Sequence, residues 1–89
     1  MTDIPQLEKY LKVLGNKKRL QMLMYMKKQR GGTVDEIADS INSKKQATSQ
    51  HLRILKLAGI ITHKKRGLFV TYRLSLNQDK AVKQVLGLL

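Results

Sequence analysis

The sequence predicts a mainly α-helical fold with one small β-hairpin (α+β), in the order four helices, two strands and a final helix. Apolar residues recur at three- and four-residue intervals before residue 60 and again at the C-terminus, which is typical of amphipathic helices. Between these regions, two short segments of alternating polarity flank a basic, glycine-containing turn, as in a hairpin. A chain of 89 residues has the size of one domain, so we expect residues 1–89 to form a single domain.

The first expected helix starts near Pro5, which suits the first turn of a helix, and either Thr2 or Asp3 can cap it. Gly15 ends it. Its apolar stripe consists of Leu7, Tyr10, Leu11 and Leu14.

Asn16 can cap a second helix, which runs to about Lys28. Apolar residues cover more than half of its circumference, so we expect it to pack between two partners, with its methionines as core filler. The expected inward side chains are Leu20, Leu23 and Met24, and those on a flank are Met22 and Met26.

Residues 30–32 (Arg-Gly-Gly) predict a turn, after which Thr33 and Glu36 form a capping box for a short helix. Ser43 and Gln46 have the same spacing and predict a helix that runs to about Ala58. Two capped helices joined by a short turn form a helix-turn-helix. The inward residues of the two helices are Ile37 and Ile41 in the first, and Thr48, Leu52, Leu55 and Ala58 in the second.

The two strands are predicted near Ile61–Lys65 and Phe69–Leu74, around a turn at residues 66–67 (Arg-Gly). Ser75 or Asn77 can cap a last helix. In the second strand, Val70, Tyr72 and Leu74 share one face, and Phe69, Thr71 and Arg73 share the other. The last helix has apolar residues at helical spacing: Val82, Val85, Leu86 and Leu89. A hairpin after a helix-turn-helix defines a winged helix-turn-helix.

The charge distribution points to a polyanionic partner. The chain has 18 Lys and Arg against 6 Asp and Glu, a net charge of +12, which favours nucleic acid or an acidic membrane surface. The 39 residues from Ser40 to Gln78 include eight Lys or Arg and no acid. An ordinary solvated basic surface would mix both signs, so this segregation favours nucleic acid.

Several classes of function lack support in the sequence. There is no cysteine, hence no disulfide or thiolate site, and no apolar segment approaches the roughly 20 residues of a membrane span. The first ten residues do not resemble a signal peptide, so we expect a cytoplasmic, nucleoid-associated protein without membrane contact. No nucleophile–base pair or glycine-rich phosphate loop is visible, so we expect neither an enzyme nor a cofactor.

The helix that begins after Ser43 has an outer side suited to reading bases. Gln can pair with adenine, Lys or Arg can pair with guanine, and Ser is versatile. A solvated face would normally also carry Glu and Asp, which are absent here. We therefore predict that the base-contacting residues are Lys45, Gln46, Ser49, Gln50 and Arg53.

Two other basic clusters suit phosphates. Cations at the hairpin turn repel one another unless an anion neutralises them, and cations at the start of the second helix lie where the helix dipole favours an anion. Arg19 is not included among the predicted phosphate contacts, because it can form an intrachain salt bridge instead. The predicted phosphate-contacting residues are Lys17, Lys18, Lys44, Lys64, Lys65, Arg66 and Arg73.

Three stretches resemble the ArsR family of small winged-helix repressors: LGNKKRLQMLMYM (Leu14–Met26), SQHLRILKLAGII (Ser49–Ile61) and GLFVTYRL (Gly67–Leu74). The resemblance extends from about Leu11 to Leu74. It implies a homodimer that binds inverted repeats near a promoter and represses transcription, with base contacts at Lys45, Gln46, Ser49 and Gln50. Two positions depart from the family: Leu68 stands where Arg or Lys often follows the wing glycine, and Lys17 stands where proline is common.

The resemblance does not extend to metal sensing. Metal sensors of the family use cysteines before the recognition helix, or histidine and acidic ligands in the last helix. This chain has Asp35 and Asp39 in the first place and Asp79 in the second, while His51 and His63 are its two histidines. We therefore predict no metal site.

The apolar stripe of the last helix exceeds what a small monomer needs, which agrees with a homodimer formed by the terminal helices. The expected partners are thus double-stranded DNA and a second copy of the chain, with any inducer left open. A nucleoid or plasmid-partition protein with the same fold is the alternative, as is a winged helix that docks a protein. The predicted interface residues are Leu7, Leu11, Val82, Val85, Leu86 and Leu89.

Overall fold

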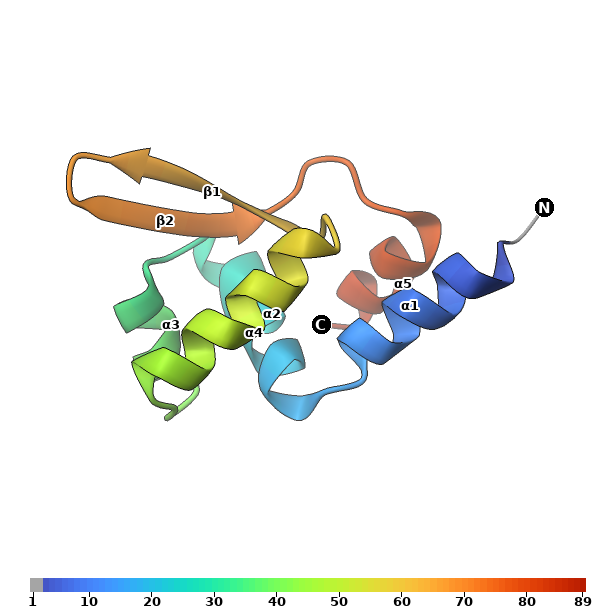
Figure 1. Ribbon diagram of the computed structural model, residues 1–89, viewed down its shortest axis with the longest axis horizontal. Helices are drawn as coiled ribbons and strands as arrows, with labels where there is room; N and C mark the ends of the chain where they lie inside the picture. The colour runs from blue at the N-terminus through green and yellow to red at the C-terminus, as the bar shows by residue number, and fades with distance from the viewer. Residues whose placement is uncertain (1–2) are drawn as a thin grey trace.

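The computed structural model describes residues 3–89, and within that range the predicted order of elements is confirmed (Figure 1). Helices α1 and α5 lie side by side at one end of the molecule, and the hairpin and α3 lie at the other, with α4 crossing in front of α2. The elements are α1 (Ile4–Leu14), α2 (Lys17–Gln29), α3 (Val34–Ser40), α4 (Lys45–Leu57), β1 (Ile61–Arg66), β2 (Phe69–Leu74) and α5 (Lys80–Leu88).

Local capping signals set the starts of the first three helices as predicted. Asp3 caps α1 by accepting from the Gln6 N–H at 3.2 Å, whereas Thr2 lies outside the described residues. Asn16 caps α2, and Thr33 and Glu36 complete both bonds of a capping box on α3. Each cap supplies an acceptor for backbone donors that the first turn of a helix leaves unpaired.

Helix α2 lies at the centre of the molecule and contacts α1, α3, α4, α5 and β2. The prediction of its inward face was partly wrong. Met22 and Met26 are buried together with Leu23, while Met24 is 37% exposed and Leu20 is half-buried. Because the apolar arc covers more than half of the helix, periodicity does not locate its centre, and the surrounding elements decide which side is innermost.

The expected capping box at the start of α4 does not form. Lys44 occupies the cap position and makes no side-chain capping bond. The Ser43 N–H donates to the Ala38 carbonyl at 2.9 Å, and Asn42 adopts a left-handed conformation with φ of 51°. These residues close the C-terminus of α3, so Ser43 belongs to the turn and is not available as the cap of α4.

The hairpin is antiparallel, with Arg66 opposite Phe69. Its turn is therefore formed by Gly67 and Leu68, one residue later than predicted, and β1 extends through Arg66. Gly67 has φ of 58°, which favours glycine. The predicted alternation of β2 is confirmed, since the side chains that share a face with Tyr72 are half-buried and the others are exposed.

The hairpin is tied to the helices at its base. Gly32 exchanges two backbone hydrogen bonds with Tyr72, at 2.9 and 2.8 Å. Just before it, Gly31 has φ of 123°, and a Cβ atom there would lie 2.7 Å from the Tyr72 carbonyl oxygen. The turn after α2 therefore requires glycine where the hairpin approaches.

Neither Ser75 nor Asn77 caps the last helix, contrary to prediction. Asp79 caps α5, with its carboxylate accepting from the Ala81 N–H at 2.9 Å. The Ser75 hydroxyl instead donates to the Gly59 carbonyl at 2.8 Å, and the Gln78 side chain donates to the Ile60 carbonyl at 2.7 Å. These bonds connect the residues after β2 to the C-terminal end of α4. Helix α5 therefore begins only at Lys80.

Candidate nucleic-acid interface

Helix α4 has one face in the core and one face in solvent. Thr48, Leu52 and Leu55 are buried, and the Thr48 hydroxyl is satisfied by donating to the Lys44 carbonyl at 2.9 Å. The opposite face is exposed and acid-free, so it can approach a polyanion closely. It carries all the residues that the sequence predicts to contact bases: Lys45, Gln46, Ser49, Gln50 and Arg53.

The N-terminus of α4 is also suited to an anion. No side chain accepts from its first turn, which leaves backbone N–H donors there for an outside acceptor. Lys44 and Lys45 stand at this end, and both are exposed. Because no side chain caps α4, its first-turn N–H groups remain able to donate to an anion.

Lys45 forms an ion pair that the sequence did not reveal. Its Nζ lies 2.8 Å from the Oδ1 of Asp35 on α3. The hydrogen bond to this carboxylate is the main reason that the pKa of Lys45 is raised, and the Coulomb attraction adds to it. Asp35 and Lys45 are ten positions apart on different helices, so no spacing rule for one helix could predict the contact.

The three cations at the start of α2 lie in different environments. Lys17 is exposed, whereas the Lys18 ammonium donates to the Ile41 carbonyl at 2.8 Å. Arg19 forms no salt bridge with a carboxylate of the described residues, contrary to the alternative raised from the sequence. Its Nε donates to the Val13 carbonyl at 2.6 Å, near the C-terminal end of α1, where the helix dipole favours a cation.

Arg19 also contacts His51 on α4, with 3.3 Å between its Nη1 and the histidine Nδ1. A guanidinium can only donate, so Nδ1 accepts and the imidazole is neutral in this arrangement. Burial lowers the pKa of His51, and the charges of Arg19 and Lys18 lower it further. His51 therefore joins α4 to α2.

The register of the hairpin separates cations that are adjacent in sequence. Lys64 pairs with Thr71 and Lys65 pairs with Val70, so successive side chains point to opposite faces. Lys64, Arg66 and Arg73 share the outer face with Arg30, which lines the same hollow from the end of α2. Arg30 was not among the predicted site residues, because residues 30–32 indicate only a turn in the sequence.

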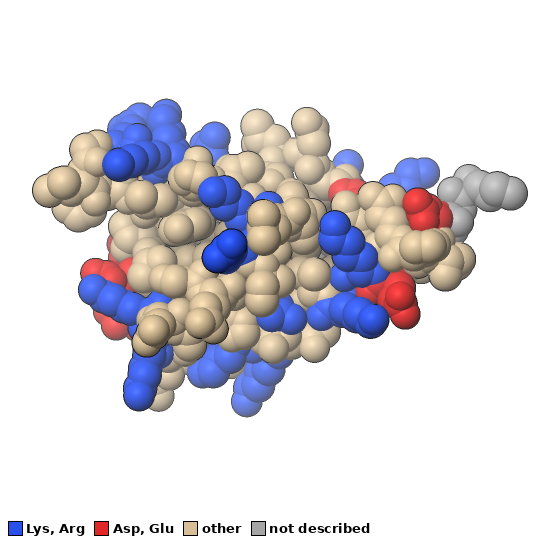
Figure 2. Space-filling model, viewed as in Figure 1, with Lys and Arg blue, Asp and Glu red and all other residues tan. Residues whose placement is uncertain are grey.

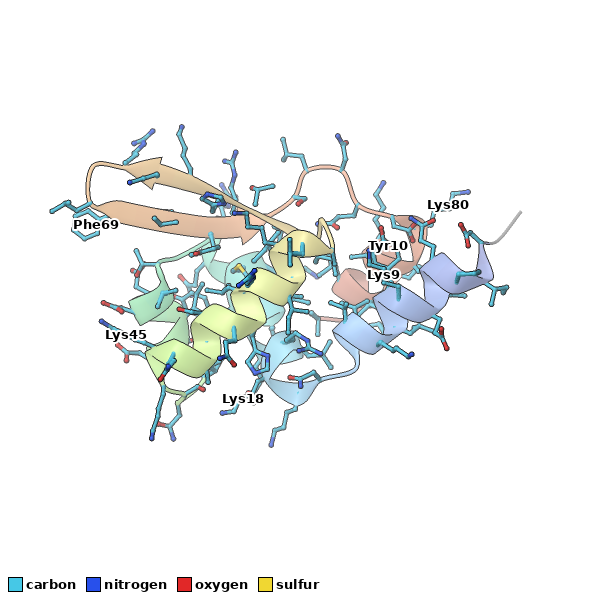
Figure 3. The ribbon with its side chains drawn as sticks, in the orientation of Figure 1. Lys9, Tyr10, Lys18, Lys45, Phe69 and Lys80 are labelled. Atoms are coloured by element: carbon cyan, nitrogen blue, oxygen red, sulfur yellow. The ribbon has the colours of Figure 1, made fainter. Side chains whose placement is uncertain are left out.

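Figure 2 shows Lys and Arg side chains gathered over the hairpin and along the lower edge of this view. A second hollow separates the hairpin from α4 and is lined in part by Asp35, Ser49 and Tyr72. At the tip of the hairpin, Leu68 is 96% exposed and Phe69 projects from the end of the molecule (Figure 3). The cationic wing thus ends in an apolar tip.

The predicted dimer residues on the terminal helices differ in solvent exposure. Val82 is 0% exposed within one copy of the chain, so its predicted place on an outer surface is wrong: it belongs to the core. Leu7 is half-buried, and so are the residues of α5 that follow Val82 in its stripe, namely Val85, Leu86 and Leu89. Leu11 is 54% exposed, and the sequence reasoning missed the exposed Ile4 and Leu88 at the same end.

Across residues 3–89, no three His, Asp or Glu side chains are grouped so that they could hold a metal ion. Within the same residues, none of the helices has the length and apolar character that a membrane span requires.

The order of elements, the exposed acid-free face of α4 and the basic hairpin are those of a winged helix-turn-helix DNA-binding transcriptional regulator. Residues 16–63, more than half of the chain, match the family model for bacterial regulatory proteins of the arsR family. The chain belongs to this family, whose members are regulators and not enzymes. No protein of curated function matches it significantly by sequence.

Solved structures agree with this assignment. Reduced HlyU from Vibrio cholerae is 28% identical with a TM-score of 0.80, over 94% of this chain and 84% of HlyU. A homodimeric winged helix-turn-helix DNA-binding domain from Mycobacterium bovis, a possible ArsR-family transcriptional regulator, is 26% identical with a TM-score of 0.78, over 96% and 75%. The antimony-specific transcriptional repressor AntR is 31% identical with a TM-score of 0.74, over 88% and 68%.

Proposed function

We propose that this protein is a homodimeric repressor that binds an inverted-repeat operator in double-stranded DNA and does so without a metal. The observation that carries the proposal is the exposed face of α4, which offers Gln, Ser, Lys and Arg side chains and no acid over a buried underside. Side chains of this kind pair with base edges in the major groove. Residues 1–89 act in this proposal as one DNA-binding domain at the nucleoid in the cytoplasm.

The contacts divide into two kinds. Lys45, Gln46, Ser49, Gln50 and Arg53 read bases from α4, because they lie on its exposed face. The phosphate contacts come from the start of α2, the start of α4 and the hairpin, which are basic. They are Lys17, Lys18, Lys44, Lys64, Lys65, Arg66 and Arg73, to which we add Arg30.

The homodimer is supported by the terminal helices and by a relative. Leu11 and Leu88 are exposed apolar side chains at the end where α1 meets α5. The similar domain from Mycobacterium bovis is homodimeric. We place the interface on Leu7, Leu11, Val85, Leu86 and Leu89, with Ile4 and Leu88 beside them.

Repression is supported by AntR, which is a transcriptional repressor, although its antimony specificity does not carry over. This chain has no cysteine and thus lacks the thiolates that soft metals prefer. The proposal accordingly leaves out metal control.

Selection of bound duplexes from random DNA, followed by footprinting, tests this function. A repressor should enrich one palindromic motif and protect one or a few discrete sites. Continuous coating or clustered repeats would instead favour the nucleoid or plasmid-partition role. An affinity for duplex DNA that does not depend on salt would contradict both roles and favour a winged helix that docks a protein.

A further inference from the structure

One carboxylate lies on the surface that we propose faces DNA. Residues 40–78, which form α4 and the hairpin, contain no acid, but Asp35 of α3 lines the hollow between them beside Ser49. A negative charge there repels phosphates, so it opposes binding to DNA of any sequence.

Asp35 contributes little to the stability of the fold. Its side chain is 60% exposed and that of Lys45 is 68% exposed, and exposed ion pairs contribute little to stability. The start of α3 is already capped by Thr33 and carries Glu36, which also satisfies the dipole of this short helix.

The bond to Asp35 changes what Lys45 can do. The ammonium sits 2.8 Å from the carboxylate, at the first position of α4, where Figure 3 labels it. A Lys45 without this partner could turn its flexible side chain towards any nearby phosphate. When Asp35 holds Lys45, the ammonium still has N–H donors available, but they are fixed near the N-terminal end of the exposed face of α4.

We propose that Asp35 is a specificity-determining residue, which holds Lys45 for a base edge and withholds it from the phosphates of non-cognate DNA. A guanine offers two acceptors, O6 and N7, to a lysine that approaches along the major groove. A phosphate offers stronger attraction to the lysine but also meets the repulsion of Asp35. The pair therefore weakens binding to all DNA while weakening cognate binding least. This inference rests on the proposed function.

The test compares Asp35→Asn with Asp39→Asn. Asp39 lies on the same helix and is exposed, and it acts on Lys45 only through its charge, without a hydrogen bond. Both variants remove one negative charge, so the difference between their salt slopes reports whether Lys45 gains a phosphate. The affinity of each is measured by salt titration on a duplex of unrelated sequence and on the duplex selected by the wild-type protein.

Relative to D39N, D35N should bind the unrelated duplex more tightly by up to about fivefold, which is the upper limit expected for one exposed ion pair. Its salt dependence on that duplex should steepen by about one unit, because Lys45 gains a phosphate. Affinity for the selected duplex should change less than about twofold, so discrimination falls. Equal salt slopes for D35N and D39N on the unrelated duplex would overturn the proposal even if selection yields no operator.

A Lys45→Gln background provides the second arm. There, D35N and D39N should give equal salt slopes on the unrelated duplex, because no Lys45 ammonium is left to gain a phosphate. A remaining difference between the slopes would assign the effect to something other than Lys45. In the free protein, the ¹⁵N chemical shift of Lys45 Nζ should change in D35N more than in D39N. Equal changes in the two variants would also overturn the proposal.

Discussion

The two ends of the molecule are built on the same core but expose opposite chemistry. At one end, α4 and the hairpin present cations without a single acid between Lys45 and Leu74, and their most exposed apolar side chains are Leu57, Leu68 and Phe69. At the other, α1 and α5 leave apolar side chains such as Leu11 and Leu88 in solvent, with charges of both signs around them. A basic polar face suits a polyanion, whereas an apolar face suits a second protein surface. The difference supports the proposal that DNA and the second copy occupy opposite ends.

Breaking the apolar end should have the largest effect. The structure favours Leu11→Glu with Leu88→Glu over changes at Val85 and Leu86, because the latter are half-buried and pack against the core of one copy. The double variant should be a monomer in sedimentation at about 20 µM, and its operator affinity should fall about 100-fold or more, since two linked half-sites bind much more tightly than one.

Leu76→Glu is the control for that experiment, because Leu76 is exposed but lies outside α1 and α5. It should remain a dimer. A monomeric wild type at the same concentration would refute the assignment of the apolar end.

Removing a base-reading side chain should have the next largest effect. Gln50→Ala should cost about 1–3 kcal/mol on the selected duplex and much less on a scrambled one, because the glutamine makes its pair of bonds only to the correct base. Gln84→Ala, on the exposed surface of α5, is the matched control and should bind both duplexes like the wild type. Equal effects on the two duplexes would show that Gln50 does not read sequence.

Removing one wing cation should act on both duplexes alike. Lys65→Gln and Arg66→Gln should each weaken binding and lower the salt slope by about one unit, because each leaves one phosphate without its cation. Lys80→Gln makes the same charge change at the far end of the molecule (Figure 3) and should leave the slope unchanged. Since Lys65 and Arg66 point to opposite faces of the hairpin, an effect of only one of them identifies the face that meets the backbone. A change in sequence preference would contradict the division of roles.

A smaller effect concerns stability. The pKa of His51 is lowered in the folded protein, chiefly by burial, so the unfolded state binds a proton first as the pH falls. The contribution of His51 to stability is therefore present above its ordinary pKa of about 6.5 and declines as the pH falls through and below that value. Urea unfolding at pH 7.5 and 5.5 should show a smaller decrease in stability for His51→Gln than for the wild type. An equal decrease of the free energy of unfolding in both proteins would show that His51 does not cause the pH dependence.

Metals should have no effect at all. Zinc, cadmium and arsenite at micromolar levels should leave the fluorescence anisotropy of a labelled operator complex unchanged, because the chain has no cysteine and no histidine in α5. Release of DNA by any of them, reversed by a chelator, would show that a metal controls binding.

Helix caps differ in how well the sequence predicts them. Asn16 and the pair Thr33 and Glu36 were predicted correctly because a cap is a local interaction within a few residues. Ser43 and Ser75 carry the same local signal, but the Ser43 N–H donates to the Ala38 carbonyl and the Ser75 hydroxyl donates to the Gly59 carbonyl, and neither serine caps a helix. Those partners are supplied by the tertiary structure.

The functional surface follows the same rule. The exposed face of α4 was predictable, because its residues follow one helical period. The bond between Asp35 and Lys45 and the contact between Arg19 and His51 each join two elements, and periodicity says nothing about such pairs. The position of Val82 was mistaken because an apolar stripe does not reveal which of its residues one copy already buries.

The most direct test of the opposed ends is an NMR titration of the wild-type protein with the selected duplex. Amide shifts should change most in residues 44–53 and 64–67, at the face of α4 and the hairpin. Amides of α1 and α5 should change little, because the dimer already covers that end before DNA is added. Shifts concentrated in α1 and α5, with α4 and the hairpin unaffected, would contradict the account.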